Sequence, residues 1–485
     1  FVFDGECMSY QIESARMMPR ETSDIMYPNA CGPVKNLALL PFNHIFGFVA
    51  VFLWYSFFGR TIVYVAEMEP KTIQYTCQRL GVTHIYGVPM IWNSLARNII
   101  QKAENEHSGR ARVLKKIVRA NIPEQPGQPL VHAGERMVSR VFIKKIKSQL
   151  FGRSVRYMIS GGGYIDASVL NLINAIGYPL YNGYGLTEAG VTSVELTGDV
   201  KKRVQGSIGR PLHRLQYSIR PFGGRDRNVG ELFIKGAALH KSVLSGGQLI
   251  PDVFEDGWMP TGDIARCDTE GRYWIVGRKK DIIINEAGEN IYPDELEWKF
   301  SGLPNVEKVC VSGLSGISVY ESIILVLECK HTASKQEMQE ISDAIAQING
   351  TLPLYQKVSR VFVSKKSLPL ANTGKVKRQA VREEIETGSE TYQEIPLGNN
   401  FLWGENEVSP QTLEKVRIAV ASSLGVLPET VALTAHYIND LGGNSLSYTS
   451  LIADLEREFG VQIPENLYAK CTNVHDFSLL ITSLL

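Results

Sequence analysis

A glycine-rich segment, Asn182-Gly-Tyr-Gly-Leu-Thr-Glu-Ala-Gly190, carries the residues best suited to chemistry in this chain. Its glycines, including Gly185, allow the backbone to approach a ligand closely, and Tyr184 offers an aromatic face for stacking. Thr187 can hold a phosphate oxygen, and Glu188 supplies a hard oxygen ligand for Mg²⁺. The pattern therefore favours a nucleotide site. A glycine-rich corner with a solvated glutamate explains the same residues without any chemistry.

Further polar and glycine-rich motifs follow one another along the chain. Each has a simpler explanation on its own: Asp263 as a turn former, Arg278 as a surface charge, Lys375 as one member of a basic run. Their occurrence together and in this order indicates a common site. The motifs are residues 40–47 with His44, residues 160–163 with Gly161, Gly162 and Gly163, residues 206–211, residues 261–263, residues 277–281, residues 288–293 and residues 372–375.

The elements that must position these motifs alternate between short β-rich runs and amphipathic segments over residues 1 to about 275. Such alternation predicts a mostly parallel sheet covered by helices. A second β-rich part follows over residues 214–276, with turn signals at Gly223-Gly224, Gly246-Gly247 and Asp256-Gly257. The predicted strands of the first part are residues 61–66, 84–88, 154–159 and 178–181, and its predicted helices are residues 70–80, 90–103, 131–150 and 166–176.

The rest of the chain predicts a smaller α+β region, a linker and a helical region. Strands are expected at residues 306–311, 323–328 and 360–363, with a helix at 335–349. Residues 387–408 are polar and rich in Gly, Ser and Asn, which is typical of a linker. Residues 409–485 are compact and helical, beginning with a helix at about 411–424.

The composition is that of an ordinary soluble globular protein, with 44% apolar and 21% charged residues. A net charge of +1 gives no electrostatic footprint for nucleic acid or a membrane surface. The seven cysteines are scattered and never spaced CxxC, which fits free thiols in a reducing compartment and no zinc site. We therefore expect a cytoplasmic protein.

The apolar run at residues 40–59 has about the length of a membrane span. Asn43 and His44 interrupt its start, and Arg60 closes it, so a buried helix leading into a buried strand explains it better than a membrane span. The chain has no initiator methionine, and Phe1-Val-Phe resembles the interior of a strand. We therefore expect a fragment of a longer polypeptide.

In this order the motifs resemble the adenylate-forming superfamily of acyl- and aryl-CoA synthetases, luciferases and nonribosomal peptide synthetase adenylation domains. The resemblance covers residues 1 to about 385. It implies an α/β large subdomain over residues 1–277, N-terminally incomplete here, and a small α+β lid subdomain over residues 278–386. It also implies an ATP-dependent acid–thiol ligase: a carboxylate attacks the α-phosphate of ATP, giving an acyl-adenylate and pyrophosphate, and a thiol then takes the acyl group.

The resemblance assigns roles to single residues. Lys375 would reach both the carboxylate and the α-phosphate, and Lys280 matches the hinge between the subdomains. Thr187 would contact phosphate, and Glu188 would hold Mg²⁺. The remaining nucleotide-binding positions are Gly161, Gly162 and Gly163 on one side of adenine, Tyr184 with Asn182 and Gly185 on the other, and Asp263 and Arg278 at the ribose hydroxyls.

Two departures from the family pattern bear on function. The Ser/Thr/Gly-rich triphosphate loop should precede Phe1, and we expect it to lie upstream in the full polypeptide. In amino-acid-activating members the position matching His44 is normally an Asp that pairs with the α-ammonium. Without that carboxylate an ammonium would be desolvated unpaired, so a simple aryl or aliphatic acid is the expected substrate. Packing alone also explains His44.

The helical region carries a second resemblance. Asp440-Leu-Gly-Gly-Asn-Ser445-Leu, followed by an amphipathic stretch at 448–459 and Gly460-Val-Gln-Ile-Pro464, resembles an acyl or peptidyl carrier domain. The implied fold is all-α with four helices, and Ser445 would carry 4'-phosphopantetheine, attached by a phosphopantetheinyl transferase. An ordinary helix N-cap serine is the simpler explanation for Ser445 alone.

Together the two resemblances predict an adenylation–carrier protein that loads an activated acid onto its own pantetheine arm for a downstream acyl-accepting enzyme. An acyl-CoA synthetase that releases acyl-CoA stays open as an alternative. So does a non-catalytic, adenylation-like scaffold that presents the carrier.

Overall fold

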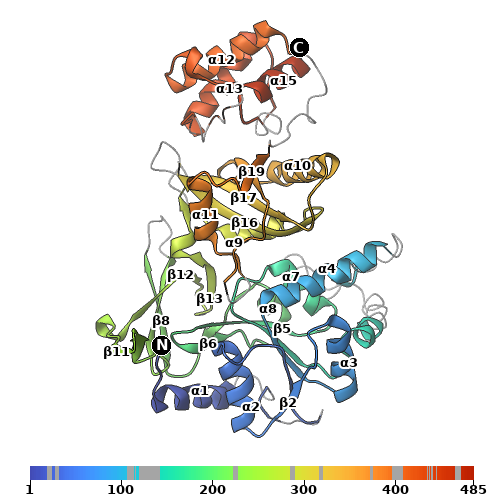
Figure 1. Ribbon diagram of the computed structural model, residues 1–485, viewed down its shortest axis with the longest axis vertical. Coiled ribbons are helices and arrows are strands. Elements are labelled where there is room, and N and C mark those ends of the chain that lie inside the picture. The colour runs from blue at the N-terminus through green and yellow to red at the C-terminus, as the bar shows by residue number, and fades with distance from the viewer. Residues whose placement is uncertain are drawn as a thin grey trace. The chain divides into compact units, whose positions relative to one another are not determined.

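The computed structural model divides into two compact units, residues 1–276 and 277–485 (Figure 1). The residues that it describes are 1–18, 25–27, 32–105, 114, 116–118, 143–221, 228–284, 290–315, 321–371, 375–395, 408–433, 435, 437, 441–443, 445–464 and 471–485.

A seven-stranded sheet forms the centre of the first unit, with strand order β2-β1-β3-β4-β5-β6-β7. Neighbours from β2 to β5 are parallel, whereas β6 and β7 are antiparallel to their neighbours. This confirms the mostly parallel sheet. The sequence predicts that the motif at residues 40–47 ends a strand, and β1 is that strand, for which no bounds were predicted. The strands are β1 (Lys35–Ala38), β2 (Thr61–Tyr64), β3 (His84–Gly87), β4 (Tyr157–Ser160), β5 (Leu180–Leu186), β6 (Gly190–Val194) and β7 (Arg210–Pro211).

Local signals explain where the helices of this unit begin and end. The helix α3 starts with Pro70 at its first position and stops at Gly81, whose φ of 63° suits glycine. Asp166 caps α7 by accepting a hydrogen bond from the Ser168 amide at 2.7 Å. The helices are α1 (Gly5–Met17), α2 (Trp54–Phe57), α3 (Pro70–Leu80), α4 (Pro89–Asn105), α7 (Ala167–Ala175) and α8 (Val200–Arg203), with the π-helix η2 (Gly47–Leu53) before α2. Of the predicted helix at 131–150, residues 131–142 lie outside the described part.

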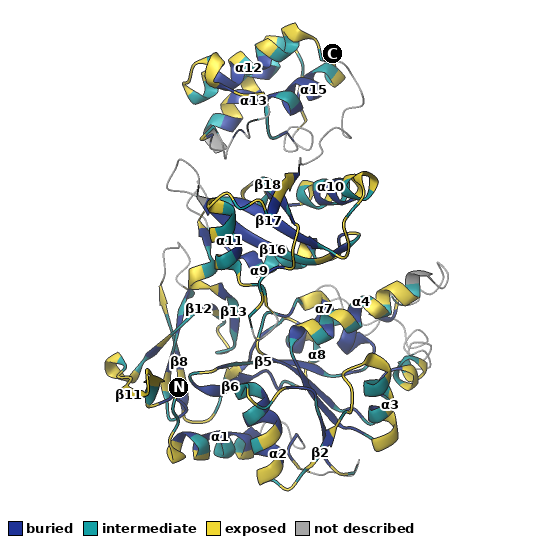
Figure 2. Cartoon of the chain, viewed as in Figure 1, coloured by how far each residue is buried: buried dark blue, intermediate teal, exposed yellow. Residues whose placement is uncertain are grey.

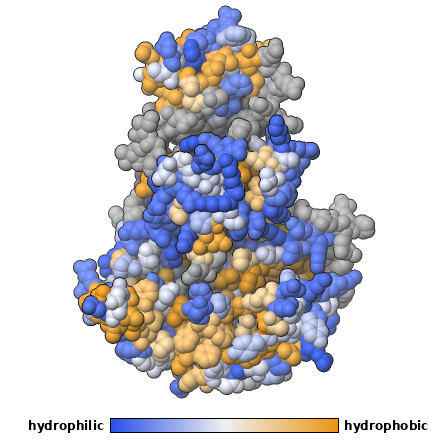
Figure 3. All heavy atoms as spheres, in the orientation of Figure 1, coloured by the Kyte–Doolittle hydropathy of each residue, from blue (hydrophilic) through white to orange (hydrophobic). Residues whose placement is uncertain are grey.

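The long apolar run forms η2 and α2 and then leads into β2, so the expected order of helix and strand is confirmed. The expectation of a buried strand was wrong, because β2 is an edge strand in which only Val63 is buried. Trp54 and Tyr55 are buried, whereas Phe57 is 60% exposed. Hydrophobic residues, orange in Figure 3, are exposed on part of the surface of this unit. No helix within the described ranges is long and apolar enough to cross a membrane.

The first residues correct one expectation, since Phe1-Val-Phe is not the interior of a strand. Val2 makes only an isolated antiparallel bridge with Ser242. Asp4 then caps α1 by accepting a hydrogen bond from the Cys7 amide at 2.9 Å, so the extended segment ends after a few residues.

The second β-rich part forms an antiparallel sheet with order β13-β12-β9-β8 and a separate hairpin, β10-β11. Gly246 and Gly247 turn the hairpin with φ angles of 57° and 80°. The expected turn at Gly223-Gly224 lies outside the described residues. The strands are β8 (Leu215–Pro221), β9 (Val229–Gly236), β10 (Ser242–Ser245), β11 (Gln248–Pro251), β12 (Met259–Cys267) and β13 (Tyr273–Arg278), with the 3-10 turn η3 (Glu255–Gly257) before β12.

The second unit begins with a small α+β region built on the sheet β16-β17-β18-β19. Leu296 of α9 and Ile341 of α10 belong to one of its apolar cores, and Val381 of α11 belongs to the other. A capping box between Ser334 and Glu337 starts α10. The elements are η4 (Lys279–Asp281), β14 (Ile283–Ile284), β15 (Asn290–Ile291), α9 (Pro293–Phe300), β16 (Val306–Ser315), β17 (Glu321–Cys329), α10 (Lys335–Gly350), η5 (Leu354–Gln356), β18 (Arg360–Ser364), α11 (Arg378–Glu386) and β19 (Tyr392–Ile395).

The strand β19 differs from the sequence expectation, which places residues 387–408 in a linker. Tyr392–Ile395 pair antiparallel with β18, and Tyr392 and Ile395 are buried. Burial of Tyr392 and Ile395 at the two ends of β19 anchors the segment in the sheet, although the two residues between them are exposed.

The helical region of the second unit contains α12 (Pro410–Leu424), η6 (Pro428–Thr430), α13 (Ser445–Phe459) and α15 (Val474–Leu484). Its own core includes Val416, Leu451, Leu455 and Phe477. Figure 2 shows buried, dark blue stretches on α12, α13 and α15. Three α-helices are described here. The fourth helix of the predicted carrier fold stays a prediction.

Candidate functional site

The carboxyl ends of parallel strands bring several predicted site residues to one edge of the main sheet. His44 follows β1, the glycines at 161–163 follow β4, and Tyr184 and Thr187 lie at the end of β5. Ligands of open α/β sheets bind outside this edge. The structure therefore places these three motifs where a ligand is expected.

The glycine loop after β4 is possible only because its residues lack side chains. The Gly161 amide donates to the Gly87 carbonyl at 3.1 Å. A Cβ atom at Gly161 would lie 2.9 Å from the Phe46 ring, and Gly162 has a φ of 79°. The loop thus presents backbone rather than side chains at the edge of the sheet.

Tyr184 and Asp263, which are 79 residues apart in sequence, form a direct hydrogen bond. The Tyr184 hydroxyl donates to Asp263 Oδ2 at 2.5 Å. Asp263 is only 3% exposed, and it lies where the register of β12 shifts between Pro260 and Ile264. Such bulges re-aim side chains. Burial and the neighbouring Asp263 carboxylate raise the pKa of Tyr184 well above its ordinary value, so its hydroxyl stays a donor.

Asn182 lies in a row of buried polar groups. Its Nδ2 donates to the Gly206 carbonyl at 2.9 Å, which leaves Oδ1 as an acceptor. Among the described residues, Asn182 Oδ1, Ser160 Oγ and Glu195 Oε2 have no hydrogen-bond partner. Ser160 and Asn182 are register partners, and the Glu195 amide donates to the Asn182 carbonyl at 2.8 Å. Two adjacent acceptors suit an amino group such as that of adenine.

Ser160 and Glu195 were not predicted as site residues. Glu195 directly follows β6, and only the folded chain shows that this residue is 4% exposed. Acidic residues are rarely buried without a reason.

Glu188 presents a carboxylate that makes no hydrogen bond or ion pair within the described part of the chain. Its backbone is fixed instead, since its carbonyl accepts from the His240 amide at 3.0 Å and lies 3.0 Å from His240 Nδ1. His240 Nε2 lies 3.0 Å from Asp252 Oδ2. His240 was not predicted, because no local pattern links it to Glu188.

The donor set around Glu188 can be tested for its fit to Mg²⁺. No group of three or more His, Cys, Asp or Glu residues that could hold a metal occurs among the described residues. Mg²⁺ in nucleotide sites is typically held by one or two carboxylates with phosphate oxygens and water. A single free carboxylate therefore fits a phosphate-bound Mg²⁺.

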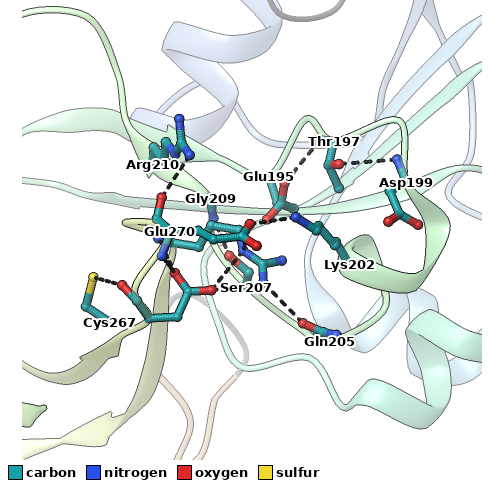
Figure 4. A network of polar contacts seen from close by, with 12 residues as sticks. Glu195, Thr197, Asp199, Lys202, Gln205, Ser207, Gly209, Arg210, Cys267 and Glu270 are labelled. Atoms are coloured by element: carbon teal, nitrogen blue, oxygen red, sulfur yellow. Dashed lines mark hydrogen bonds and ion pairs between the residues drawn. The ribbon is translucent and has the colours of Figure 1, made fainter. Parts of the chain in front are cut away.

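The loop at residues 206–211 is a structural support (Figure 4). Ser207 Oγ accepts from the Gly209 amide at 2.9 Å and donates to the Tyr273 carbonyl at 3.1 Å. A Cβ atom at Gly209 would lie 2.4 Å from the Val194 carbonyl oxygen. Beside the loop, Lys202 pairs with Glu270 at 2.6 Å. These contacts tie β7 to β13 beneath the candidate site.

Arg278, Lys280 and Lys375 belong to the second unit, and all three are exposed. Arg278 ends β13, and Lys280 lies in η4. The Lys375 carbonyl accepts from the Ala371 amide at 2.7 Å. Residues 372–374, and residues 285–289 of the other glycine motif, lie outside the described part.

Ser445 is the first residue of α13, and its side chain is not among those described. The Gly443 amide before it donates to the Tyr437 carbonyl at 2.9 Å. A Cβ atom at Gly443 would lie 2.3 Å from the Tyr437 ring, so only glycine fits there. A helix start favours an attached phosphate, which suits a phosphopantetheine arm at Ser445.

Comparison with known protein families gives two matches. Residues 20–244 match the AMP-binding enzyme family, and residues 414–481 match the phosphopantetheine attachment site family.

Curated relatives include CoA ligases. The chain is 28% identical over 254 residues to 2-succinylbenzoate–CoA ligase of Oceanobacillus iheyensis, covering 52% of this chain and 49% of the relative. It is 30% identical over 240 residues to long-chain-fatty-acid–CoA ligase FadD13 of Mycobacterium tuberculosis, covering 49% and 46%. The chain thus spans about half the length of these relatives.

Two solved structures share the fold. McyG A-PCP complexed with phenylalanyl-adenylate superposes with a TM-score of 0.67 at 15% identity, over 98% of this chain and 69% of that one. The o-succinylbenzoate CoA synthetase of Bacillus subtilis with its acyl-adenylate gives 0.55 at 22% identity, over 78% and 65%. The chain therefore combines an AMP-binding domain of the adenylate-forming fold with a C-terminal phosphopantetheine-attachment domain.

Proposed function

We propose that this protein activates a carboxylic acid with ATP as an acyl-adenylate and transfers the acyl group to the phosphopantetheine of its own carrier domain. The observation that carries the proposal is the Tyr184–Asp263 pair at the carboxyl edge of an AMP-binding domain, on a chain that also bears an attachment domain. ATP, a carboxylic acid and a phosphopantetheinyl transferase are the implied partners.

The first step must bring two anions together, so its barrier is largely electrostatic. Mg²⁺ held through Glu188 would supply charge neutralisation at the phosphates. Lys375 is the residue that we assign to the carboxylate and α-phosphate, because its exposed ammonium can be aimed at the developing charge. Arg278 and Asp263 are assigned to the ribose hydroxyls, and Thr187 to phosphate.

Adenine is assigned to the space between the loop at 161–163 and Tyr184, with Asn182 Oδ1 and Glu195 Oε2 as acceptors for its amino group. Gly185 supports this arrangement, because a Cβ atom there would lie 2.3 Å from the Gly190 carbonyl. The α+β region of the second unit would act as the lid and Lys280 as its hinge.

The acid is proposed to be aryl or aliphatic rather than an α-amino acid. His44 stands at the end of β1, where amino-acid-activating members carry an Asp. The acids in the names of two relatives, 2-succinylbenzoate and long-chain fatty acids, agree with this class.

The second candidate is an acyl-CoA synthetase that releases acyl-CoA, since the curated relatives are CoA ligases. The attachment domain favours the first candidate, because a carrier on the same chain makes transfer effectively intramolecular. A non-catalytic scaffold is the third. A four-helix carrier, a cytoplasmic location and a downstream acyl-accepting enzyme complete the proposal.

Intact mass spectrometry tests it. The phosphopantetheinylated protein is incubated with ATP, Mg²⁺ and a panel of carboxylic acids. We expect the pantetheine mass on Ser445 and a further acyl mass from one acid, with Ser445→Ala as the unloaded control. Pantetheinylation without acyl gain or pyrophosphate release from any acid would favour the scaffold.

A further inference from the structure

An ionic cluster in the second unit joins three segments through one guanidinium. Arg378, the first residue of α11, lies with Nη1 2.7 Å from Asp281 Oδ2, and with Nη2 3.0 Å from Asp294 Oδ1 and 2.9 Å from Glu297 Oε1. The Arg378 side chain is 12% exposed, and the carboxylates are between 19% and 23% exposed. We call these four residues the Arg378 cluster.

The position of Arg378 is unusual for a helix. A cation in the first turn opposes the helix dipole and costs stability there. The three carboxylates around Arg378 offset this unfavourable interaction with the helix dipole. The position of Arg378 is therefore explained by its ion pairs and not by stabilisation of α11.

Three of the four members of the cluster lie close in sequence to a segment with a proposed part in the reaction. Asp281 directly follows Lys280, and Asp294 follows the motif at residues 288–293. Arg378 stands three residues after Lys375. Glu297 also accepts a hydrogen bond from the Val311 amide at 2.9 Å, which anchors the cluster to β16.

The charges of the cluster depend on one another. Burial alone would raise the pKa of Asp294, but the positive charges of Lys375 and Arg378 hold that pKa below its ordinary value. Burial raises the pKa of Glu297 despite Arg378. Three carboxylates around one guanidinium leave an excess of negative charge, so the cluster also attracts the Lys375 ammonium.

We infer that Arg378 is the positioning residue that holds the Lys375 loop, the segment after Lys280 and the start of α9 together as one rigid body. The inference rests on the proposed function, because it gives these segments their parts in the two half-reactions. Rotation at the proposed hinge, Lys280, would then move the segment around Lys375 and the start of α9 together, without a change in the structure of either.

Hydrogen exchange tests this directly in the full 485-residue chain, with Arg378→Lys as the variant. An ammonium keeps the charge but cannot reproduce the planar fork that meets three carboxylates. We expect exchange at Ala371 and Lys377, whose amides bond to Lys375 and Pro369 carbonyls, and in the first turn of α9, to accelerate together by about tenfold or more. Amides of β16 and β17 should keep their protection.

Arg382→Lys is the matched control. Arg382 lies one turn further along α11 and pairs with Glu321 and with Glu386, outside the cluster. It should leave exchange in both segments unchanged. The inference is overturned if Arg378→Lys and Arg382→Lys behave alike or if only one segment responds. It is also overturned if β16 and β17 exchange faster as well, which would indicate general destabilisation.

Asp281→Asn is a milder second variant for the case that Arg378→Lys does not fold. It weakens only the ion pair between Arg378 and the residue that follows Lys280. Hydrogen exchange in η4 should therefore become faster, while the first turn of α9 stays protected. Unchanged exchange in η4 would contradict the inference. Since exchange requires no turnover, these results stand apart from the proposed activity. Lys375→Ala should lower the rate of adenylation by about 10²- to 10³-fold without altering exchange at Lys377.

Discussion

At the scale of single residues, the predicted site residues are of two kinds. Some side chains are hydrogen-bonded to each other, whereas others present a charge that can interact with a ligand. The Tyr184 hydroxyl and the Asp263 carboxylate are bound to each other. The Glu188 carboxylate has no partner in the part of the chain that the structure describes, and Lys375 is exposed. Held groups favour recognition of a rigid nucleoside, whereas the available charges suit the phosphates and the reacting carboxylate.

Lys375→Ala should lower the rate of acyl-adenylate formation by about 10²- to 10³-fold, because one charge aimed at the transition state is lost. Thioester formation from preformed adenylate should change little. Pyrophosphate release measures the first half-reaction, and loading of supplied acyl-adenylate measures the second. Lys377→Ala, which removes a neighbouring exposed lysine, is the control. Equal losses in both half-reactions would contradict the assigned role.

Tyr184→Phe keeps the aromatic face but removes the 2.5 Å donor to Asp263. Hydrogen bonds to charged groups contribute about 1.5–3 kcal/mol, so KM for ATP should rise by roughly tenfold or more. KM for the acid should stay close to that of the unmodified protein. Tyr217→Phe, which removes the 2.7 Å bond to Thr192, serves as a comparison. An unchanged KM for ATP would show that the Tyr184–Asp263 bond does not support nucleotide binding.

At the scale of secondary-structure elements, the interior strand β3 contains a buried titratable group. His84 is fully buried, stacks on Tyr157 at a ring separation of 4.8 Å, and lies with Nδ1 2.8 Å from Thr83 Oγ1. Burial, with a contribution from the charge of Arg156, lowers the pKa of His84 to about 3. The imidazole of His84 is therefore neutral in the folded unit at neutral pH.

This pKa makes the stability of the first unit depend on pH. The unfolded chain takes up a proton at His84 near pH 6.5, whereas the folded unit takes it up only near pH 3. Stability is therefore lost as the pH falls between these values, by about 2 kcal/mol from pH 7 to pH 5. Urea unfolding followed by tryptophan fluorescence measures the change. His84→Gln should remove much of this dependence, whereas exposed His213→Gln should not; an equal slope in all three proteins would refute the assignment.

At the scale of the whole molecule, the proposed function would place activation and acceptance of the acid on one chain. The AMP-binding match and the attachment-site match are separate regions of it. A tethered acceptor has an effective concentration in the millimolar range when its linker can span the two sites. Competition with a free thiol then reports whether the domains work together.

With the holo form and about 0.1 mM CoA, acylated carrier should exceed acyl-CoA by roughly tenfold in the first turnover because of this effective concentration. Radiolabelled acid, separated into protein-bound and CoA-bound fractions, measures the ratio. Ser445→Ala should abolish the protein-bound label while pyrophosphate release continues. Accumulation of acyl-CoA with an unloaded carrier would favour the CoA-ligase alternative.

Elements with strong local signals were predictable from the sequence. Pro70 and Gly81 delimit α3, the capping box starts α10, and Pro410 and Gly425 delimit α12. These signals act within one helical turn, so they need no tertiary context. The strand β19 was not predictable, since polar Gln393 and Glu394 separate its buried residues and only pairing with β18 makes it a strand.

The sequence by itself determined the order of the motifs and hence the kind of chemistry to expect. Only the tertiary structure decided which residues meet: Tyr184 with Asp263 across 79 positions, Glu188 with His240 across 52, and Asp281 with Arg378 across 97. Such contacts depend on strand register and on the end at which each strand stops, which local propensity does not encode. The contacts of Glu195, His240 and Arg378 can therefore be identified only in the folded chain.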